Sequence, residues 1–325
     1  MRCLHLCTLY SGRGPFVALM FMRIYTHPCC IQHETPDGHP ERSDRLRYLL
    51  AHLSDTGFSQ DHRVTEAPPI EAARVAEAHH PNLLERLAQS VPERGLTSLD
   101  PDTWMGSSSL SAALQAAGSV WQGVRDVVEG PETRVFCAVR PPGHHAEFDS
   151  PMGFCLLNSV AIAAINALSL PEIERVAILD FDVHHGNGTV DLCRGYPDIL
   201  VCSSFQHPHY PHRLHDLIAA NIVNTPLKAG TSGDDFRRAV THSWWPAIEA
   251  HQPDLIFISA GFDAHRADPL AQINLVEADF AWVTREIAAL AGQFAQGRVV
   301  STLEGGYDLE ALAHSALAHL RALAE

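Results

Sequence analysis

Four short segments of this sequence carry histidine, aspartate and tyrosine side chains directly after apolar runs. They span Arg140–His145, Asp180–Gly186, Gly261–Asp263 and Glu304–Tyr307. Histidine and aspartate bind metal ions and transfer protons, and a tyrosine hydroxyl donates hydrogen bonds. Together these residue types could catalyse a hydrolysis, provided that the fold brings the four segments to one place.

Asp182 and His184 are two residues apart on an extended segment, so their side chains point to the same side. Asp263 could complete a set of one nitrogen and two oxygen ligands. Three protein ligands leave one coordination position for water and substrate, as a catalytic zinc ion requires, whereas a structural zinc is usually closed by four ligands that include cysteine. We predict a catalytic zinc site here. The alternative is that these side chains only cap turns at strand ends.

The pair His144-His145 follows Pro-Pro-Gly, a rigid turn that fixes the direction of both imidazole rings. Beside zinc, one histidine could take a proton from water and return it to a leaving amine, while the other stabilises the developing charge. Tyr307 follows two glycines and could donate a hydrogen bond to the oxyanion of a tetrahedral intermediate. The alternative for the histidines is a pair of polar loop residues, which we expect His79-His80 to be.

Short, continuously apolar runs alternate with helical patterns along the chain. Continuous hydrophobicity predicts strands that are buried on both faces of a parallel sheet. We expect strands at 23–26, 134–139, 176–181, 199–203, 221–224, 255–260 and 298–303, and helices at 43–54, 70–90, 107–129, 156–169, 233–250, 277–296 and 308–323. The pattern predicts a single doubly wound α/β domain, with a central, mostly parallel sheet flanked by helices. Ligands of such sheets bind beyond the carboxyl ends of the strands, where the four segments lie.

Composition narrows the class of protein further. The 325 residues are 46% hydrophobic and carry a net charge of −15, which disfavours direct binding to nucleic acid or to anionic membranes. Eight cysteines without a CxxC pair indicate reduced thiols and a cytoplasmic location. The apolar run at 16–21 is too short to span a membrane. We expect residues 1–21 to be an extension, because translation could start at Met22, and residues 22–325 to form the catalytic domain.

The combined motifs resemble those of the zinc-dependent histone deacetylases and their bacterial relatives, which include acetylpolyamine amidohydrolases. The resemblance rests on HHAEFDSPMGFCLLN, DFDVHHGNGT, SAGFDAHRADPL and EGGY, and on HETPDGHPERSDRL nearer the N-terminus. It implies an arginase/deacetylase-like fold. Asn187 in HHGNGT stands where class I members usually carry aspartate, so the chain looks closer to the class II branch.

The resemblance also implies a role for each matching residue. His145 would be the general base and acid, His144 the second catalytic imidazole, and Tyr307 the group that polarises the substrate carbonyl. Asp180 and Asn187 would hydrogen-bond the outer nitrogens of His144 and His145. Zinc would be bound by Asp182, His184 and Asp263, and a nearby potassium ion by Asp180, Asp182, His184, Ser203 and Ser204.

The family's substrate channel has aromatic walls. By resemblance, Phe154 and Tyr210 would form these walls, and Gly153 and Gly305 would also contact substrate. Leu270 would lie at the rim, where relatives that prefer acetylated polyamines carry glutamate. We therefore expect acylated lysine in a peptide or protein as substrate, with a small acylated amine as the alternative. Arg42 would lie behind the metal, where a cation could guide acetate out.

Two other functional classes remain to be weighed. A ureohydrolase of related fold would need a second metal ion and extra bridging carboxylates, but His184 is followed by His185 and Gly186. A pseudoenzyme that binds acylated tails without cleaving them would be expected to lack a catalytic residue, and each expected residue is present. The sequence leaves the oligomeric state open.

Overall fold

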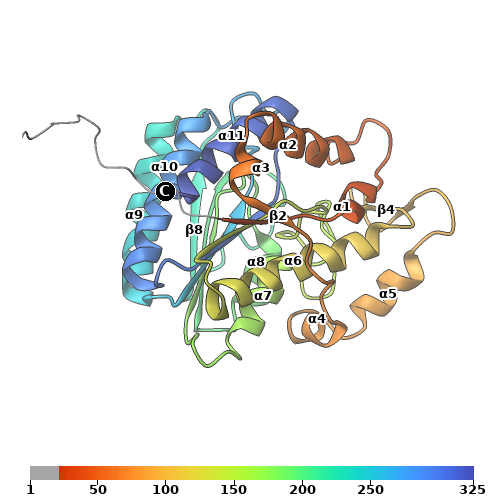
Figure 1. The fold of residues 1–325 in the computed structure, drawn as a ribbon, viewed down its shortest axis with the longest axis horizontal. Coiled ribbons are helices and arrows are strands. Elements are labelled where there is room, and N and C mark those ends of the chain that lie inside the picture. Colours follow the sequence, from red (N-terminus) through yellow and green to blue (C-terminus); the bar gives the residue numbers. More distant parts are fainter. Residues whose placement is uncertain (1–21) are drawn as a thin grey trace, which may run out of the picture.

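The apolar runs of the sequence form the strands of one sheet in a computed structural model, which describes residues 22–325 (Figure 1). Every pair of neighbouring strands in this sheet is parallel, in the order β2-β1-β5-β10-β9-β6-β7-β8. The strands are β1 (Arg23–Tyr25), β2 (Arg63–Thr65), β5 (Arg134–Cys137), β6 (Val176–Asp180), β7 (Ile199–Gln206), β8 (Ile222–Leu227), β9 (Leu255–Ala260) and β10 (Val299–Leu303). The predicted parallel α/β sheet is confirmed.

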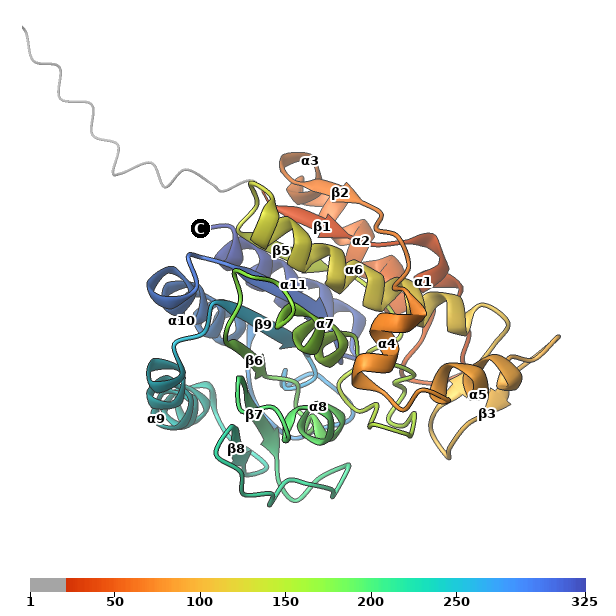
Figure 2. The ribbon, with the colours of Figure 1, turned by 90° about the horizontal axis from the view of Figure 1, so that it is seen from below.

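Two groups of helices cover the two faces of the sheet, as Figures 1 and 2 show. One face packs against α6 (Ser109–Glu129), α7 (Ser159–Ala167) and α8 (Asn187–Cys193). On the other side lie α9 (Gly233–His251), α10 (Glu277–Phe294) and α11 (Leu309–Leu323), with α2 (Ser43–Asp55) against α11. Because both faces are covered, every residue of β6, β7, β9 and β10 is buried, which explains their continuous hydrophobicity.

The four strands that precede the reactive segments are neighbours in the sheet. β5, β10, β9 and β6 lie side by side in this order, and all run in the same direction. Their carboxyl ends therefore deliver the four segments to one edge of the sheet. This arrangement is the one that the sequence pattern predicts, and it places the candidate catalytic residues next to one another.

The structure differs from the sequence expectations in several short elements. The helix expected at 70–90 is two helices, α4 (Ala72–Ala78) and α5 (Leu83–Ser90), because Pro81 lacks an N–H and restricts the residue before it. Other elements are too short to show a periodicity and were not predicted: the edge strand β2, the helices α1 (Pro28–Gln32), α3 (Phe58–Asp61) and α8, and the hairpin of β3 (Thr97–Ser98) with β4 (Trp104–Met105).

Within residues 22–325, none of the helices is both long and apolar enough to cross a membrane. The six cysteines of this range are free thiols: Cys29, Cys30, Cys137, Cys155, Cys193 and Cys202. The expected extension at 1–21, with Cys3 and Cys7, lies outside the described residues.

Candidate active site

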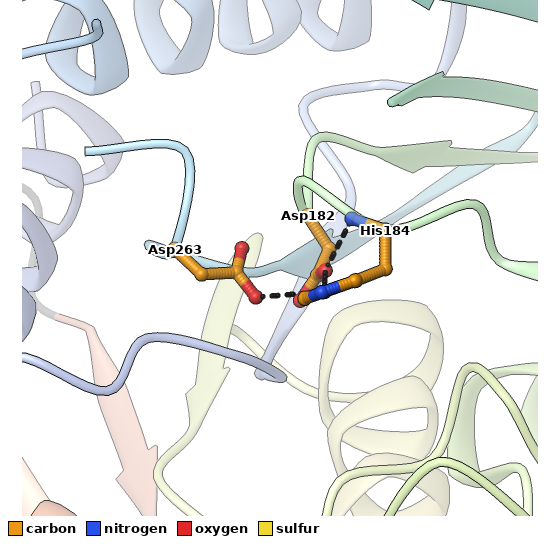
Figure 3. A group of neighbouring side chains, drawn as sticks. All are labelled: Asp182, His184 and Asp263. Atoms are coloured by element: carbon orange, nitrogen blue, oxygen red, sulfur yellow. Dashed lines mark hydrogen bonds and ion pairs between the residues drawn. The ribbon is translucent and has the colours of Figure 1, made fainter. Parts of the chain in front are cut away.

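Three buried side chains converge just beyond the ends of β6 and β9. Asp182 and His184 follow β6, Asp263 follows β9, and Figure 3 shows all three pointing toward one another. The Nδ1 atom of His184 lies 3.1 Å from Asp182 Oδ1 and 3.2 Å from Asp263 Oδ2. One potential ligand atom from each residue lies within 4.8 Å of the others. Among the described residues, no other group of three or more histidine, cysteine or acidic side chains meets this condition.

The electrostatics of this triad favour a cation. Burial disfavours a charged imidazole, yet the two carboxylates outweigh that effect and raise the pKa of His184 to about 10. Burial likewise opposes ionisation of Asp182, and the adjacent imidazoles of His144 and His184 lower its pKa. One nitrogen and two oxygen donors in a buried, negatively charged cluster fit a zinc ion, which could take the place of the proton on His184.

Glycine backbone encloses the triad on one side. A Cβ atom at Gly305 would lie 2.0 Å from Asp263 Oδ2 and 2.5 Å from Asp182 Oδ2, and a Cβ at Gly261 would lie 2.1 Å from Asp182 Oδ2. The N–H of Gly305 donates a hydrogen bond to Asp182 Oδ2 at 2.8 Å. The carboxylates can therefore approach the backbone only where no side chain is present. Gly305, expected to contact substrate, packs against the predicted metal ligands.

The tandem histidines have different partners and different electrostatics. His144 Nδ1 lies 3.0 Å from Asp180 Oδ2, and His145 Nδ1 lies 2.7 Å from Asn187 Oδ1. Burial opposes protonation of His144, but the carboxylates of Asp182 and Asp180 prevail and raise its pKa well above the ordinary value. Burial, together with the charge of His144, holds the pKa of His145 well below it. The imidazole of His144 is thus suited to carry a positive charge, and that of His145 is suited to accept a proton.

A cavity of about 220 Å³ is lined by His184 of the triad and by the imidazole of His145. The rings of Phe154 and Tyr307 meet edge to face at 5.8 Å between centroids, and Tyr210 meets His145 in the same way at 5.2 Å. The structure thus brings together most of the predicted channel residues and adds two that the sequence analysis missed, Asp102 and His209. The lining residues are Asp102, His145, Gly153, Phe154, His184, His209, Tyr210, Leu270 and Tyr307.

The two serines expected to bind potassium, Ser203 and Ser204, lie on the neighbouring strand β7. Ser203 is aligned with Asp180 of β6 in the sheet register, and both Ser203 and Ser204 are buried. The N–H of Gly186 donates to Ser203 Oγ at 3.4 Å, and the N–H of Asp182 donates to Asp180 Oδ1 at 3.0 Å. The sheet therefore places these polar groups beside the triad.

The expectation that Arg42 lies behind the metal site is wrong. The Arg42 side chain is 41% exposed and pairs with Asp44 at the surface. Arg45 is fully buried instead, donates to the carbonyl oxygens of Gly306 and Glu304 at 2.6 Å each, and lies over the ring of Tyr307. The physical reason is the rotation of α2 about its own axis, which determines the residues that face the core. The buried residues of this helix are Arg45, Leu46, Leu49 and Leu53. A charged residue on this apolar stripe was the signal that could have identified Arg45.

Three buried carboxylates that the sequence analysis gave no role hold the reactive segments in place. Glu304 accepts the N–H groups of Gly143 and His144 at 2.7 and 3.2 Å, and burial raises its pKa to about 7. Asp268 accepts the N–H of Tyr307 at 2.7 Å. Glu41 binds the guanidinium groups of Arg45 and Arg140. Buried carboxylates of this kind follow no local spacing rule, so the sequence offers little signal for them.

His79 is also placed differently from our expectation of a polar loop residue. It is completely buried, its Nδ1 lies 3.0 Å from the carbonyl oxygen of Glu147, and its Nε2 accepts the N–H of Asn158 at 2.9 Å. Burial lowers the pKa of His79 to about 4, so the ring stays neutral at neutral pH. His79 is therefore a structural bridge across the loop that follows the catalytic histidine candidates.

Comparison with known proteins decides the family. Residues 39–323 match the histone deacetylase domain. The chain is 39% identical to an uncharacterised protein of Synechocystis sp. over 90% of this chain and 96% of that protein. It is 32% identical to a probable deacetylase of Archaeoglobus fulgidus over 94% of this chain and 87% of that protein. The chain belongs to the histone deacetylase family.

A solved structure and a longer relative agree with this assignment. The HD domain of HDA15 matches the structure with a TM-score of 0.88 and 31% identity, over 94% of this chain and 89% of that domain. Type-2 histone deacetylase 2 of Dictyostelium discoideum is 33% identical over 92% of this chain, which spans only 20% of that protein's length. The histone deacetylase family is zinc-dependent, and this chain is a hydrolase of acyl-amide bonds with a candidate metal-binding triad.

The different environments of Arg45 and Arg42 predict different effects on stability. Replacing Arg45 with Met should lower the free energy of unfolding by about 3–5 kcal/mol, because a buried carboxylate, Glu41, loses one of its two cations. The matched change Arg42→Met should alter it by less than about 0.5 kcal/mol, because Arg42 pairs only at the surface. Urea denaturation of both variants measures the difference. Equal effects would show that Arg45 does not support the Tyr307 segment.

Proposed function

We propose that this chain is a zinc-dependent hydrolase that removes acyl groups from acylated lysine side chains of peptides or proteins. One zinc ion per chain would be held by Asp182, His184 and Asp263. The observation that carries the proposal is the common cavity, which the metal-ligand candidate His184, the imidazole of His145 and the hydroxyl-bearing Tyr307 all line. When bound, zinc supplies a Lewis acid that polarises an acyl carbonyl and makes water more acidic.

His145 and His144 would have different roles in the reaction. His145 faces the cavity and is held at Nδ1 by Asn187, so its other nitrogen is free to accept a proton from water and later to protonate the leaving amine. His144, held by Asp180, would carry a positive charge that stabilises the negative charge developing in the tetrahedral transition state.

Tyr307 would stabilise the oxyanion of the tetrahedral intermediate. A tyrosine hydroxyl keeps its proton at neutral pH, and burial raises the pKa of Tyr307 well above the ordinary value, so it remains a hydrogen-bond donor. Asp268 binds its backbone N–H, and Arg45 lies 4.9 Å from the centre of its ring. These contacts orient the phenol before substrate arrives.

The substrate preference follows from the walls of the cavity. Phe154 and Tyr210 present aromatic surfaces that would enclose the methylene groups of a lysine side chain, and Leu270 adds no charge. A second candidate substrate is an acetylated polyamine, because Asp102 brings a carboxylate to the same cavity. That carboxylate already accepts hydrogen bonds from Gly153 N–H and the Thr103 hydroxyl, which supports the lysine assignment.

Two further features belong to the same proposal. A potassium ion would be bound near the zinc by Asp180, Asp182, His184, Ser203 and Ser204, supported by the alignment of Asp180 with Ser203. A cytoplasmic location is supported by the free thiols among the described residues.

The role of Tyr307 predicts a specific kinetic defect. Tyr307→Phe should preserve the fold and the zinc content and reduce kcat on the order of 100-fold, the usual loss for one oxyanion donor. Turnover of a fluorogenic acetyl-lysine peptide measures the effect. A variant within roughly twofold of the wild-type rate would show that this phenol does not stabilise the transition state.

The substrate preference predicts an outcome for Leu270. The wild-type protein should have a higher kcat/KM for acetyl-lysine peptides than for acetylspermidine or acetylputrescine, because the apolar walls offer a distal ammonium group little to pair with. Leu270→Glu should change this ratio by about tenfold in favour of the polyamine, and so narrow or reverse the preference. A carboxylate near a partly desolvated cation contributes about 1 kcal/mol or more.

Both substrate types are assayed with both proteins, and Leu270→Gln is the matched control for size without charge. A wild-type preference for the polyamine would overturn the lysine assignment and leave the amidohydrolase chemistry intact. An unchanged ratio in Leu270→Glu would show that Leu270 does not lie where substrates enter.

A further inference from the structure

A buried carboxylate stands directly behind the partner of His145. Glu147 is 6% exposed, and its Oε1 accepts a hydrogen bond from Asn187 Nδ2 at 2.7 Å. The Oδ1 atom of the same Asn187 amide lies 2.7 Å from His145 Nδ1. The three side chains therefore form a continuous hydrogen-bonded row that begins at the cavity wall, and Glu147 occupies the end away from the cavity.

The order of atoms in this row determines which nitrogen of His145 carries the proton. An amide can present either its oxygen or its NH₂ group to a neighbour, whereas an ionised carboxylate only accepts hydrogen bonds. Glu147 therefore requires the NH₂ of Asn187, which leaves Asn187 Oδ1 for His145. An oxygen at that position requires N–H at Nδ1 of His145, and the nitrogen that serves as the base stays unprotonated. If the amide turned over, its NH₂ would face Nδ1 and favour a proton on the wrong nitrogen.

The other contacts of Asn187 Nδ2 are weaker and enforce this orientation less firmly. Its Nδ2 lies 3.4 Å from the carbonyl oxygen of His145 and 3.3 Å from the sulfur of Met152, a weak acceptor. The 2.7 Å bond to the Glu147 carboxylate is the short, charge-assisted one.

Glu147 is itself held in place from two sides. Its Oε2 forms an ion pair of 2.8 Å with Arg213, which belongs to the segment that follows Tyr210. Its backbone N–H donates a hydrogen bond to the carbonyl oxygen of Ser150, and its own carbonyl oxygen lies 3.0 Å from Nδ1 of the buried His79. The carboxylate therefore has a defined position and a guanidinium group as its charged partner.

We propose that Glu147 is a positioning residue for proton transfer, which fixes the orientation of the Asn187 amide and through it the tautomer of His145. The inference rests on the proposed function, in which His145 is the general base. Glu147 thereby gives the segment His144–Glu147 a role beyond its two histidines. Its ion pair with Arg213 also connects His145 to the channel segment that contains Tyr210.

A reciprocal pair of substitutions tests the proposal. Glu147→Met removes the acceptor, so the Asn187 amide can turn over, and kcat should fall at least tenfold and by no more than the roughly 10²–10⁴-fold that a general base contributes. KM and zinc content should change little, because Glu147 is not among the residues that line the cavity. In Glu147→Met/Asn187→Asp, either oxygen of the new aspartate can accept from His145, so orientation no longer matters. Because the new charge raises the proton affinity of His145, each protein is measured at its own pH optimum, where kcat of the double variant should return to within about threefold of wild type.

Matched controls separate this role from a general effect on the loop. Asp149→Asn removes a carboxylate two residues away that pairs with Arg86 at the surface, and it should leave kcat unchanged. Should Glu147→Met not yield folded protein, the smaller pair Glu147→Ala and Glu147→Ala/Asn187→Asp also removes the acceptor and applies the same logic. A single variant within about twofold of wild type, or a double variant no faster than the single one, would overturn the proposal.

A spectroscopic readout does not depend on turnover. Long-range ¹H–¹⁵N NMR of the zinc-loaded protein, with the His145 signals assigned from a His145→Gln variant, should show the Nδ1-protonated tautomer in wild type and an increase in the Nε2-protonated form in Glu147→Met. The same tautomer in both proteins would contradict the inference. If wild type shows the expected tautomers but hydrolyses neither acyl-lysine peptides nor acylated polyamines, the proposed function fails and the positioning role stands.

Discussion

Several carboxylates are buried together at the carboxyl edge of the sheet, and the rest of the site depends on how their charge is compensated. Asp180, Asp182 and Asp263 have no measurable exposure to solvent, and the first two follow one another on the same strand end. Charges of like sign in a medium of low dielectric constant repel strongly unless cations or hydrogen bonds offset them. A proton on His184 meets part of this requirement, and a divalent metal ion would meet it more fully.

The surrounding structure supplies the remaining compensation in two ways. Backbone N–H groups donate to the carboxylates, as those of Gly305 and Val183 do for Asp182 and Asp263. A buried ionic cluster behind the site then fixes the strand-end segments themselves. In this cluster Glu41 joins two arginines, of which Arg45 holds the carbonyl oxygens beside Tyr307.

The partners of His144 and His145 also determine how charge is distributed at the site. His144 is held by a carboxylate directly, whereas His145 is held by a neutral amide with a carboxylate one step further away. A carboxylate beside His145 would raise the proton affinity of its imidazole, and the intervening amide keeps that charge at a distance. The two neighbouring imidazoles can thus have opposite protonation states although they lie 4.0 Å apart.

Much of this arrangement could be predicted from the sequence, because two physical signals were strong. Continuous apolar runs identified the parallel strands, and polar residues at their ends identified the edge where Asp182, His184 and Asp263 meet. What could not be predicted depends on the direction of single side chains. Arg42 and Arg45 are equivalent by residue type, and only the phase of α2 shows which is buried. His79 and Glu147 acquire their roles through partners far away in the chain, which no spacing rule reveals.

We infer that the buried carboxylates and His184 form one open metal site, which metal analysis can test. Purified protein that has been loaded with zinc and dialysed should contain about one zinc ion per chain, and Asp263→Ala should lose it, because two ligands seldom hold zinc against water. Fluorescence of the tryptophans would confirm that the variant remains folded. Two tightly bound transition metals per chain, or full zinc retention in Asp263→Ala, would contradict the account.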